Sequence, residues 1–352
     1  KLHVEDNEIE TIEPSVLNNI LEFAINKNKL SEIPNSFQGK FPKSHVLLNC
    51  NRYSTFDLSF FIKTIGEINL SLCNLTEFPS TTFELPNLST LILFGNQITE
   101  IPPNFSTSHV TILDVSMNPI SILPPVPQHM SDLRINHCLI SDVCESISNN
   151  NRIRFFYAVG NKLKKLPNFQ NIEELFASRN EITEFPTIST RSSSKKVFLD
   201  LSHNQIKTLP RNLRMHFSLF DISYNPIEEI PKELLFSNNA SYNFCGIPSL
   251  TMEINLNELT RISFLNVFGT NIKVNSLNAS KQVVIDEMKF GHHPYTPQTI
   301  YFECDKSVGF SDTIGKRNSM EDTMVIRQHF CKRQDADAEV RTALFGLFDG
   351  HK

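Results

Sequence analysis

The chain has 352 residues, 40% of them hydrophobic, and its 33 basic and 38 acidic side chains leave a net charge of −5. This acidic balance excludes a strongly basic nucleic-acid binder, and no apolar run reaches the ~18 residues of a membrane span. We therefore expect no nucleic-acid partner. Seven scattered cysteines without a Cys-x-x-Cys pair favour a reducing compartment, so we expect a cytoplasmic protein, or a nuclear one.

One repeating pattern occupies most of the chain, from about residue 2 to about residue 275. Aligned on Asn96, it reads L-x-x-L-x-L-x-x-N-x-I-x-x-I-P and ends at Pro102. Further strong copies are centred on Asn28, Cys73, Asn118, Asn161, Asn180, Asn204 and Asn225, and weaker copies on Asn7, Asn51, Cys138, Cys245 and Thr270. The spacing corresponds to about 13 repeats of about 22 residues each.

This pattern resembles the leucine-rich repeat. Each repeat is expected to give one short parallel strand, with its leucines pointing into the solenoid and the intervening side chains on the concave face. The recurring Asn, or Cys in its place, would bond backbone groups at each turn. The Ile/Leu-Pro step favours extended or 3₁₀ backbone over helix. We therefore predict an α/β-type leucine-rich repeat solenoid over residues 1–280, with few long helices.

Aromatic side chains gather at variable positions of neighbouring repeats. We use the name aromatic patch for Phe155, Tyr157, Phe176 and Phe198, which have Arg154 and Arg179 beside them in the sequence. Aromatic residues flanked by Arg are typical of an anchor for a protein partner, so we predict a protein partner on the concave repeat face. The alternative is that abundant Phe residues pack between repeats or under a second domain.

Composition changes near residue 280. Asn supplies 34 of the first 280 residues but only Asn318 among the last 72. A turn-rich stretch, Gly291-His292-His293-Pro294-Tyr295-Thr296-Pro297, follows the change. Such a shift indicates a domain boundary. We predict a linker over residues 281–303 and a second domain that begins at residue 304.

Two motifs stand in the last segment. Gly315-Lys316-Arg317-Asn318-Ser319-Met320-Glu321-Asp322 precedes a strand-like run, and a second strand-like run, 343–348, leads into Asp349-Gly350-His351. Their order resembles the start of a PPM-type metal-dependent protein serine/threonine phosphatase, with G-x-R-x-x-M-E-D and then D-G-H. The resemblance implies that residues 304–352 are the incomplete N-terminal part of an α+β phosphatase sandwich, and that the sequence belongs to a longer protein.

The phosphatase resemblance also implies a reaction. Two Mg²⁺ or Mn²⁺ ions would activate water for hydrolysis of a phosphoserine or phosphothreonine protein substrate. Arg317 would hold the substrate phosphate, and Asp322 would order the surrounding water. The metal ions would be bound by Asp349 and by the Gly350 carbonyl, and Glu321 would contact a metal ion through a water molecule. Because the family's remaining metal ligands would lie beyond residue 352, the chain alone is predicted to be inactive.

Three functions remain open at this stage. The main interpretation is a phosphatase whose repeats tether a substrate or regulator. The first alternative is a repeat scaffold with a degenerate phosphatase-like segment, because Lys352 stands where the family usually has Gly. The second is a regulatory phosphatase-like module upstream of another catalytic domain, an order similar to that of fungal adenylyl cyclases.

Overall fold

The chain divides into two compact units, residues 1–287 and residues 288–352. The structure is a computed structural model, and it describes residues 2–13, 15, 23–32, 45–57, 65–190, 195–211, 213, 215–236, 240–255, 262–275, 282–284, 299–302, 308–311, 323–331 and 342–348.

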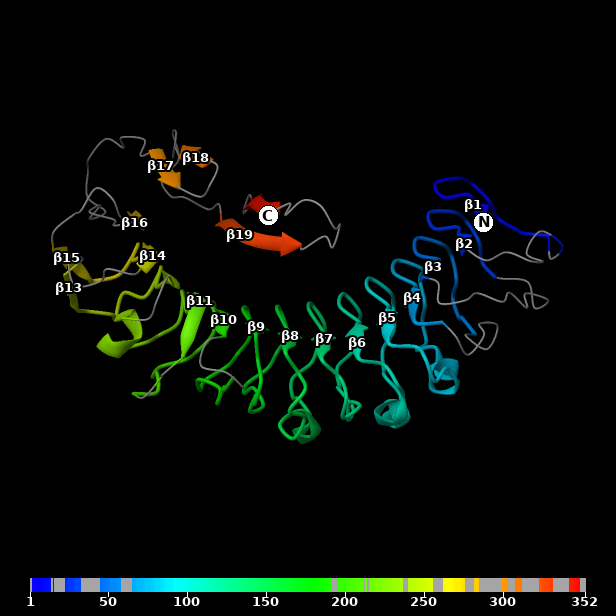
Figure 1. Cartoon of the computed structure of the whole chain (residues 1–352), viewed down its shortest axis with the longest axis horizontal. Helices are drawn as coiled ribbons and strands as arrows, with labels where there is room; N and C mark the ends of the chain where they lie inside the picture. Colours follow the sequence, from blue (N-terminus) through cyan, green and yellow to red (C-terminus); the bar gives the residue numbers. More distant parts are fainter. Residues whose placement is uncertain are drawn as a thin grey trace. The chain divides into compact units, whose positions relative to one another are not determined.

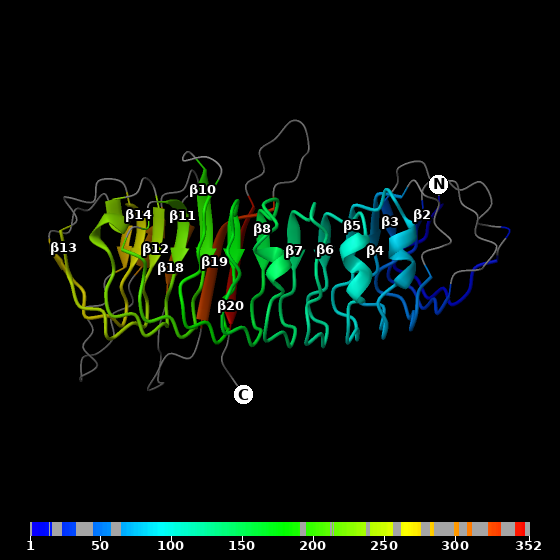
Figure 2. The same ribbon diagram turned by 90° about the horizontal axis from the view of Figure 1, so that it is seen from below.

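The first unit is built on a parallel sheet of 14 strands that follow one another in chain order (Figure 1). These strands are β1 (Leu2–His3), β2 (Phe23–Ala24), β3 (His45–Leu47), β4 (Glu67–Asn69), β5 (Thr90–Ile92), β6 (Ile112–Asp114), β7 (Asp132–Arg134), β8 (Phe155–Tyr157), β9 (Glu174–Phe176), β10 (Lys196–Asp200), β11 (His216–Asp221), β12 (Ala240–Asn243), β14 (Ile262–Asn266) and β16 (Gln282–Val284). Figure 2 shows strands of this array side by side in a perpendicular view. The expected parallel solenoid is confirmed.

The outer side of the first unit carries short 3₁₀ turns and a second small sheet. The turns are η3 (Ser80–Glu84), η4 (Pro103–Thr107), η5 (Glu145–Ile147) and η6 (Lys232–Phe236), and the small sheet pairs β13 (Glu253–Asn255) with β15 (Lys273–Asn275). In Figure 1 the 3₁₀ turns lie on the outer side of the curve, opposite the strands. The described part of the unit thus has the short helical turns predicted from the Ile/Leu-Pro steps.

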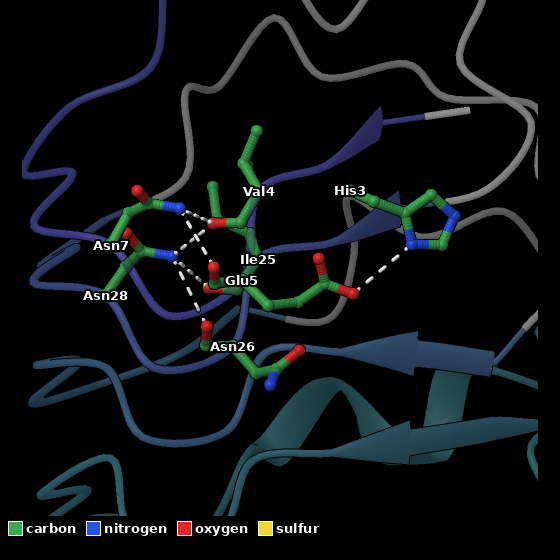
Figure 3. A network of polar contacts seen from close by, with 7 residues as sticks. All are labelled: His3, Val4, Glu5, Asn7, Ile25, Asn26 and Asn28. Carbon is green, nitrogen blue, oxygen red and sulfur yellow. Dashed lines mark hydrogen bonds and ion pairs between the residues drawn. The ribbon is translucent and has the colours of Figure 1, made fainter.

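The regular spacing of Asn along the chain reflects a ladder of hydrogen bonds between repeats. Asn118 is buried, its Oδ1 accepts from the Ile98 N–H at 3.0 Å, and its Nδ2 donates to the Leu93 and Val115 carbonyls at 2.9 Å each. Asn28 repeats this arrangement near the N-terminus with the Val4 and Ile25 carbonyls (Figure 3). Each side chain therefore satisfies buried backbone groups of two neighbouring repeats.

One predicted ladder position is wrong. Asp221 pairs in register with Asn243, and the Tyr224 N–H donates to the Cys245 carbonyl, so Cys245 lies two residues before the ladder position. The ladder position of this repeat is occupied by buried Ile247. An apolar residue at the ladder position gives no polar signal in the sequence, so the position is fixed only by the strand pairing.

The residue before each ladder position has a left-handed backbone. Four are glycines, Gly95, Gly160, Gly246 and Gly269, and others are Leu72, Met117, His137, Arg179, His203 and Tyr224. A Cβ atom on Gly160 would lie 2.5 Å from Nδ1 of His137, and one on Gly246 would lie 2.5 Å from the Tyr224 ring. Other residues adopt the same positive φ at equivalent turns, so what distinguishes Gly160 and Gly246 is the side chain of the preceding repeat that covers them.

The second unit contains two antiparallel strand pairs among its described residues. Strand β17 (Thr299–Phe302) pairs with β18 (Val308–Ser311), and β19 (Thr323–Cys331) pairs with β20 (Thr342–Phe348). The two strand-like runs that separate the phosphatase-like motifs in the sequence lie in β19 and β20.

Candidate functional site

The concave face of the 14-stranded sheet is formed by alternate strand residues. In β4, β5, β6 and β8 the middle residue is buried and both flanking residues are partly exposed, because successive side chains point to opposite faces. The register aligns the flanking residues in two rows across the sheet. From β6 to β11 the first row is Ile112, Asp132, Phe155, Glu174, Phe198 and Leu219, and the second row is Asp114, Arg134, Tyr157, Phe176, Asp200 and Asp221.

The centre of this face is a stacked aromatic pair. The rings of Tyr157 and Phe176 lie 5.5 Å apart between centroids and are nearly parallel, at 4°. The Tyr157 hydroxyl donates to Oε2 of Glu174 at 2.6 Å, and burial, together with this bond, raises the pKa of Tyr157. Phe176 is only 6% exposed, whereas Tyr157 is partly exposed. Tyr157 is therefore the accessible surface of a rigid stack.

Arg134 belongs to the same site although the sequence analysis did not select it. Its guanidinium lies 5.3 Å from the centroid of the Tyr157 ring and donates to both carboxylate oxygens of Asp132, at 3.1 and 2.8 Å. The hydrogen bonds from Arg134 to Asp132 raise the pKa of Arg134. This cation extends the stack by one strand. The sequence signal for Arg134 is its position in the repeat frame, which is the position that Tyr157 occupies one repeat later.

Arg154 lies at the margin of the aromatic patch. It donates to both oxygens of Glu173, at 2.9 and 2.8 Å, and its guanidinium lies 5.0 Å from the centroid of the Phe155 ring. Lys195 also contacts Glu173, and the bond from Arg154 lowers the pKa of the Glu173 carboxyl. The charge of Arg154 is thus balanced by Glu173, and its guanidinium packs on the Phe155 ring at the edge of the patch.

The structure separates the remaining predicted residues. Phe198 lies in β10 opposite Glu174 in the register, whereas Phe176 lies opposite Asp200, so Phe198 and Phe176 occupy different rows. Arg179 lies in the left-handed turn after β9 and is exposed. Burial and then the charge of Arg179 lower the pKa of His203, which places Arg179 beside His203 at the end of the strands. The structure thus brings Tyr157 and Phe176 into contact, with Arg134 over the Tyr157 ring and Arg154 over the Phe155 ring. Glu174 lies between Phe155 and Phe198 in the first row, and Arg179 lies apart from the patch.

Two aspartates occupy neighbouring second-row positions just beyond the stack. Asp200 pairs with Asp221 in the register of β10 and β11. Oδ1 of Asp200 accepts from the Ser202 N–H and hydroxyl at 3.0 and 2.7 Å, and Oδ1 of Asp221 accepts from Ser223 in the same way at 3.0 and 2.6 Å. Burial, and then the charge of Asp200, raises the pKa of the Asp221 carboxyl to about 7. We call these two residues the aspartate pair.

Asp221→Asn is expected to stabilise the protein at pH 8 and to have little effect near pH 4. The folded state holds the Asp221 proton up to a pKa of about 7, whereas the unfolded chain releases it near pH ~3.9. The wild type therefore loses stability as pH rises between these values. Asparagine does not ionise, but it gives up the bond that Oδ2 of Asp221 accepts from Nδ2 of Asn243 at 2.8 Å, so we expect a net gain of about 1–2 kcal/mol at pH 8. Urea unfolding at both pH values measures the difference, with Glu181→Gln as the exposed control, and an equal effect at both pH values would contradict the prediction.

The predicted phosphatase residues, Arg317, Glu321, Asp322, Asp349 and Gly350, lie outside the described residues. Among the described residues, no three His, Cys, Asp or Glu side chains form a group that could hold a metal ion. No helix in the described part of the chain is long and apolar enough to cross a membrane.

Comparison with known proteins identifies the fold of the array. A family model for the leucine-rich repeat matches residues 87–108. The chain is similar to Podocan-like protein 1 from Mus musculus, 31% identical over 160 residues, which are 44% of this chain and 25% of that relative. Among solved structures it resembles an internalin (inlF) from Listeria monocytogenes, with a TM-score of 0.63 and 16% identity over 81% of this chain and 86% of the internalin. It also resembles the plant peptide hormone receptor RGFR1 in complex with RGF2, with a TM-score of 0.53 and 18% identity over 70% of this chain and 47% of the receptor.

Proposed function

We propose that this leucine-rich repeat protein is an interaction scaffold that binds a protein partner on its concave face, with the aromatic patch as the anchor. The observation that carries the proposal is the stack of Arg134, Tyr157 and Phe176, which three neighbouring strands hold in place. A preordered aromatic surface loses little conformational entropy when a partner binds, and such residues dominate binding energy at interfaces.

The comparisons support an interaction role. The chain spans a quarter of the length of its mouse relative, so the repeats are one part of that larger protein. The structure of the plant receptor was solved in complex with RGF2, an example of this fold with a bound partner. In the present chain the partly exposed side chains of the concave face, Tyr157 among them, are available for a partner.

Tyr157→Ala is expected to weaken partner binding about tenfold or more, because it removes the exposed ring of the stack. Binding is measured by quantitative affinity purification of wild-type and variant chains from the native cell extract, followed by titration of the purified partner. Tyr157→Phe keeps the stack and removes only the hydroxyl bond to Glu174, so it should retain most of the affinity. Ile122→Ala, at an exposed position outside the strands, is the control. A partner that binds Tyr157→Ala as tightly as the wild type would refute the proposed site.

We also infer that the C-terminal segment begins a PPM-type phosphatase domain in the natural protein. The support is the order of the two motifs in the sequence, with the antiparallel pair β19–β20 between them. Carboxylates at Glu321 and Asp349 and the Gly350 carbonyl are the oxygen donors that suit two Mg²⁺ or Mn²⁺ ions. Bound metal would supply activated water, Arg317 would bind the substrate phosphate, and Asp322 would order water near it.

A phosphatase assay of the natural protein tests this second proposal. We expect Mn²⁺-dependent hydrolysis of a phosphothreonine peptide, which Asp349→Asn should abolish by removing a metal ligand. The 352-residue chain alone should show no hydrolysis above a metal-free control. Activity of the natural protein that is indifferent to Asp349→Asn, or hydrolysis by the short chain, would contradict this assignment. Neither result bears on the concave face.

A further inference from the structure

The concave face around the aromatic patch carries negative charge that the described residues do not balance. In the second row, Arg134 is engaged by Asp132, whereas Asp200 and Asp221 take part in no ion pair with Lys or Arg within the described part of the chain. Among the described residues, the carboxylate of Glu174 in the first row accepts from the Tyr157 hydroxyl and forms no ion pair. The side of the aromatic patch toward the C-terminal repeats is therefore acidic.

The aspartate pair is electrostatically unfavourable in the unbound protein. Neighbouring strands are about 4.8 Å apart, so like charges at paired positions repel one another. The raised pKa of the Asp221 carboxyl, caused first by burial and then by Asp200, reflects this. A cation placed between the two carboxylates would remove the repulsion.

The turn-closing bonds of these aspartates, which Oδ1 accepts, do not require a carboxylate; the second oxygen of Asp221 has a separate bond, from Nδ2 of Asn243 at 2.8 Å. At the same row position Asn69 accepts from the Ser71 N–H and hydroxyl at 3.0 and 2.7 Å. Asn243 and Asn266 likewise accept backbone N–H groups two residues later, at 3.2 and 3.1 Å. The array thus closes this turn with neutral asparagine elsewhere, so the charge of the aspartate pair serves another purpose.

We propose that the concave face binds a basic polypeptide segment, which inserts a Lys or Arg side chain between Asp200 and Asp221 and rests an apolar or aromatic side chain on Tyr157. This inference rests on the proposed scaffold function and specifies the partner. Asp200 and Asp221 lie two and three strands from Tyr157, or about 10–14 Å. An extended segment that crosses the strands rises about 3.4 Å per residue, so the anchor and the basic residue are about three or four residues apart.

Selection from a random peptide library displayed on phage, with the full 352-residue chain as bait, tests the inference. We expect the selected peptides to carry Lys or Arg about three or four residues from an aromatic residue or Leu. Synthetic copies should bind Asp200→Asn/Asp221→Asn about tenfold more weakly than the wild type, and added salt should weaken wild-type binding. Glu181→Gln/Glu184→Gln removes the same charge from exposed positions outside the strands and should leave affinity unchanged.

The outcomes separate this inference from the proposed function. Peptides that depend on Tyr157 but bind the double Asp→Asn variant with unchanged affinity would overturn the basic-partner inference and leave the scaffold proposal standing. Peptides that tolerate both Tyr157→Ala and the double variant would overturn both. Asparagine occupies the same row position elsewhere, so the variant is expected to fold; circular dichroism checks this, and single Asp200→Asn provides a milder second variant.

Discussion

Asn118→Ala is expected to lower the free energy of unfolding by about 3 kcal/mol. The side chain is 2% exposed and bonds the Ile98 N–H and the Leu93 and Val115 carbonyls. Its removal leaves the buried Ile98 N–H without its partner, at about 1–3 kcal/mol. It also takes one of two donors from the Leu93 carbonyl, which still accepts from Asn96, and from the Val115 carbonyl, which still accepts from Sγ of Cys138. Urea unfolding followed by circular dichroism measures the loss.

Hydrogen exchange adds a local measure for Asn118→Ala. The Ile98 amide, which donates to Asn118 in the wild type, should exchange faster in the variant, and the repeats on either side should open together because they share the ladder. Asn104→Ala, at an exposed position in η4, is the control and should change stability by less than ~0.5 kcal/mol. Equal effects of the two substitutions would show that the ladder is not a major source of stability.

Phe220→Ala is expected to cost about 3–5 kcal/mol, because it opens a cavity in the core beneath β11. Phe220 is fully buried, and its ring centroid lies 4.7 Å from Phe217, 6.0 Å from Tyr242 and 6.2 Å from Phe185. Thermal and urea unfolding measure the loss of stability. Phe220→Leu fills part of the cavity and should lose less.

The Phe220 substitution also reports on the neighbouring acidic site. Asp221 follows Phe220 in β11 and pairs with Asp200 in β10. A cavity beneath β11 should therefore let the strand shift and change the distance between the two carboxylates. Phe268→Ala, at a residue that is 38% exposed, is the matched control and should have a small effect on stability. A loss below ~1 kcal/mol for Phe220→Ala would contradict the packing described for this part of the core.

The repeat frame could be predicted from the sequence because its physics is local. Each strand needs alternate buried residues, and each turn needs a side chain that bonds two repeats, so Leu and Asn recur with one period. The stacked pair could be predicted in the same way, since Tyr157 and Phe176 occupy equivalent places in that frame, whereas Phe155 lies at the position of Glu174. The error at Cys245 arose where an apolar residue, Ile247, fills the ladder position.

The charged part of the site could not be predicted because it depends on pairing between strands. Arg134 and Tyr157 come from different repeats and meet only through the register of β7 and β8. Arg179, by contrast, is close to Phe176 in the chain but lies past the end of the strand. The aspartate pair likewise requires knowledge that β10 and β11 are aligned at Asp200 and Asp221.

The covered glycines of the left-handed turns constrain which substitutions this array can accept during evolution. His137 lies over Gly160 and Tyr224 lies over Gly246, so each bulky residue and its glycine belong to different repeats. Elsewhere in this column of turns bulky residues lie side by side, as the stacked rings of His203 and Tyr224 do at 4.3 Å between centroids. The loss of a whole repeat therefore places side chains against neighbours of a kind that the column already holds, whereas a single substitution at Gly160 or Gly246 drives a new Cβ atom into the ring that covers it. Lineages of this array should vary in repeat number more readily than at these two glycines.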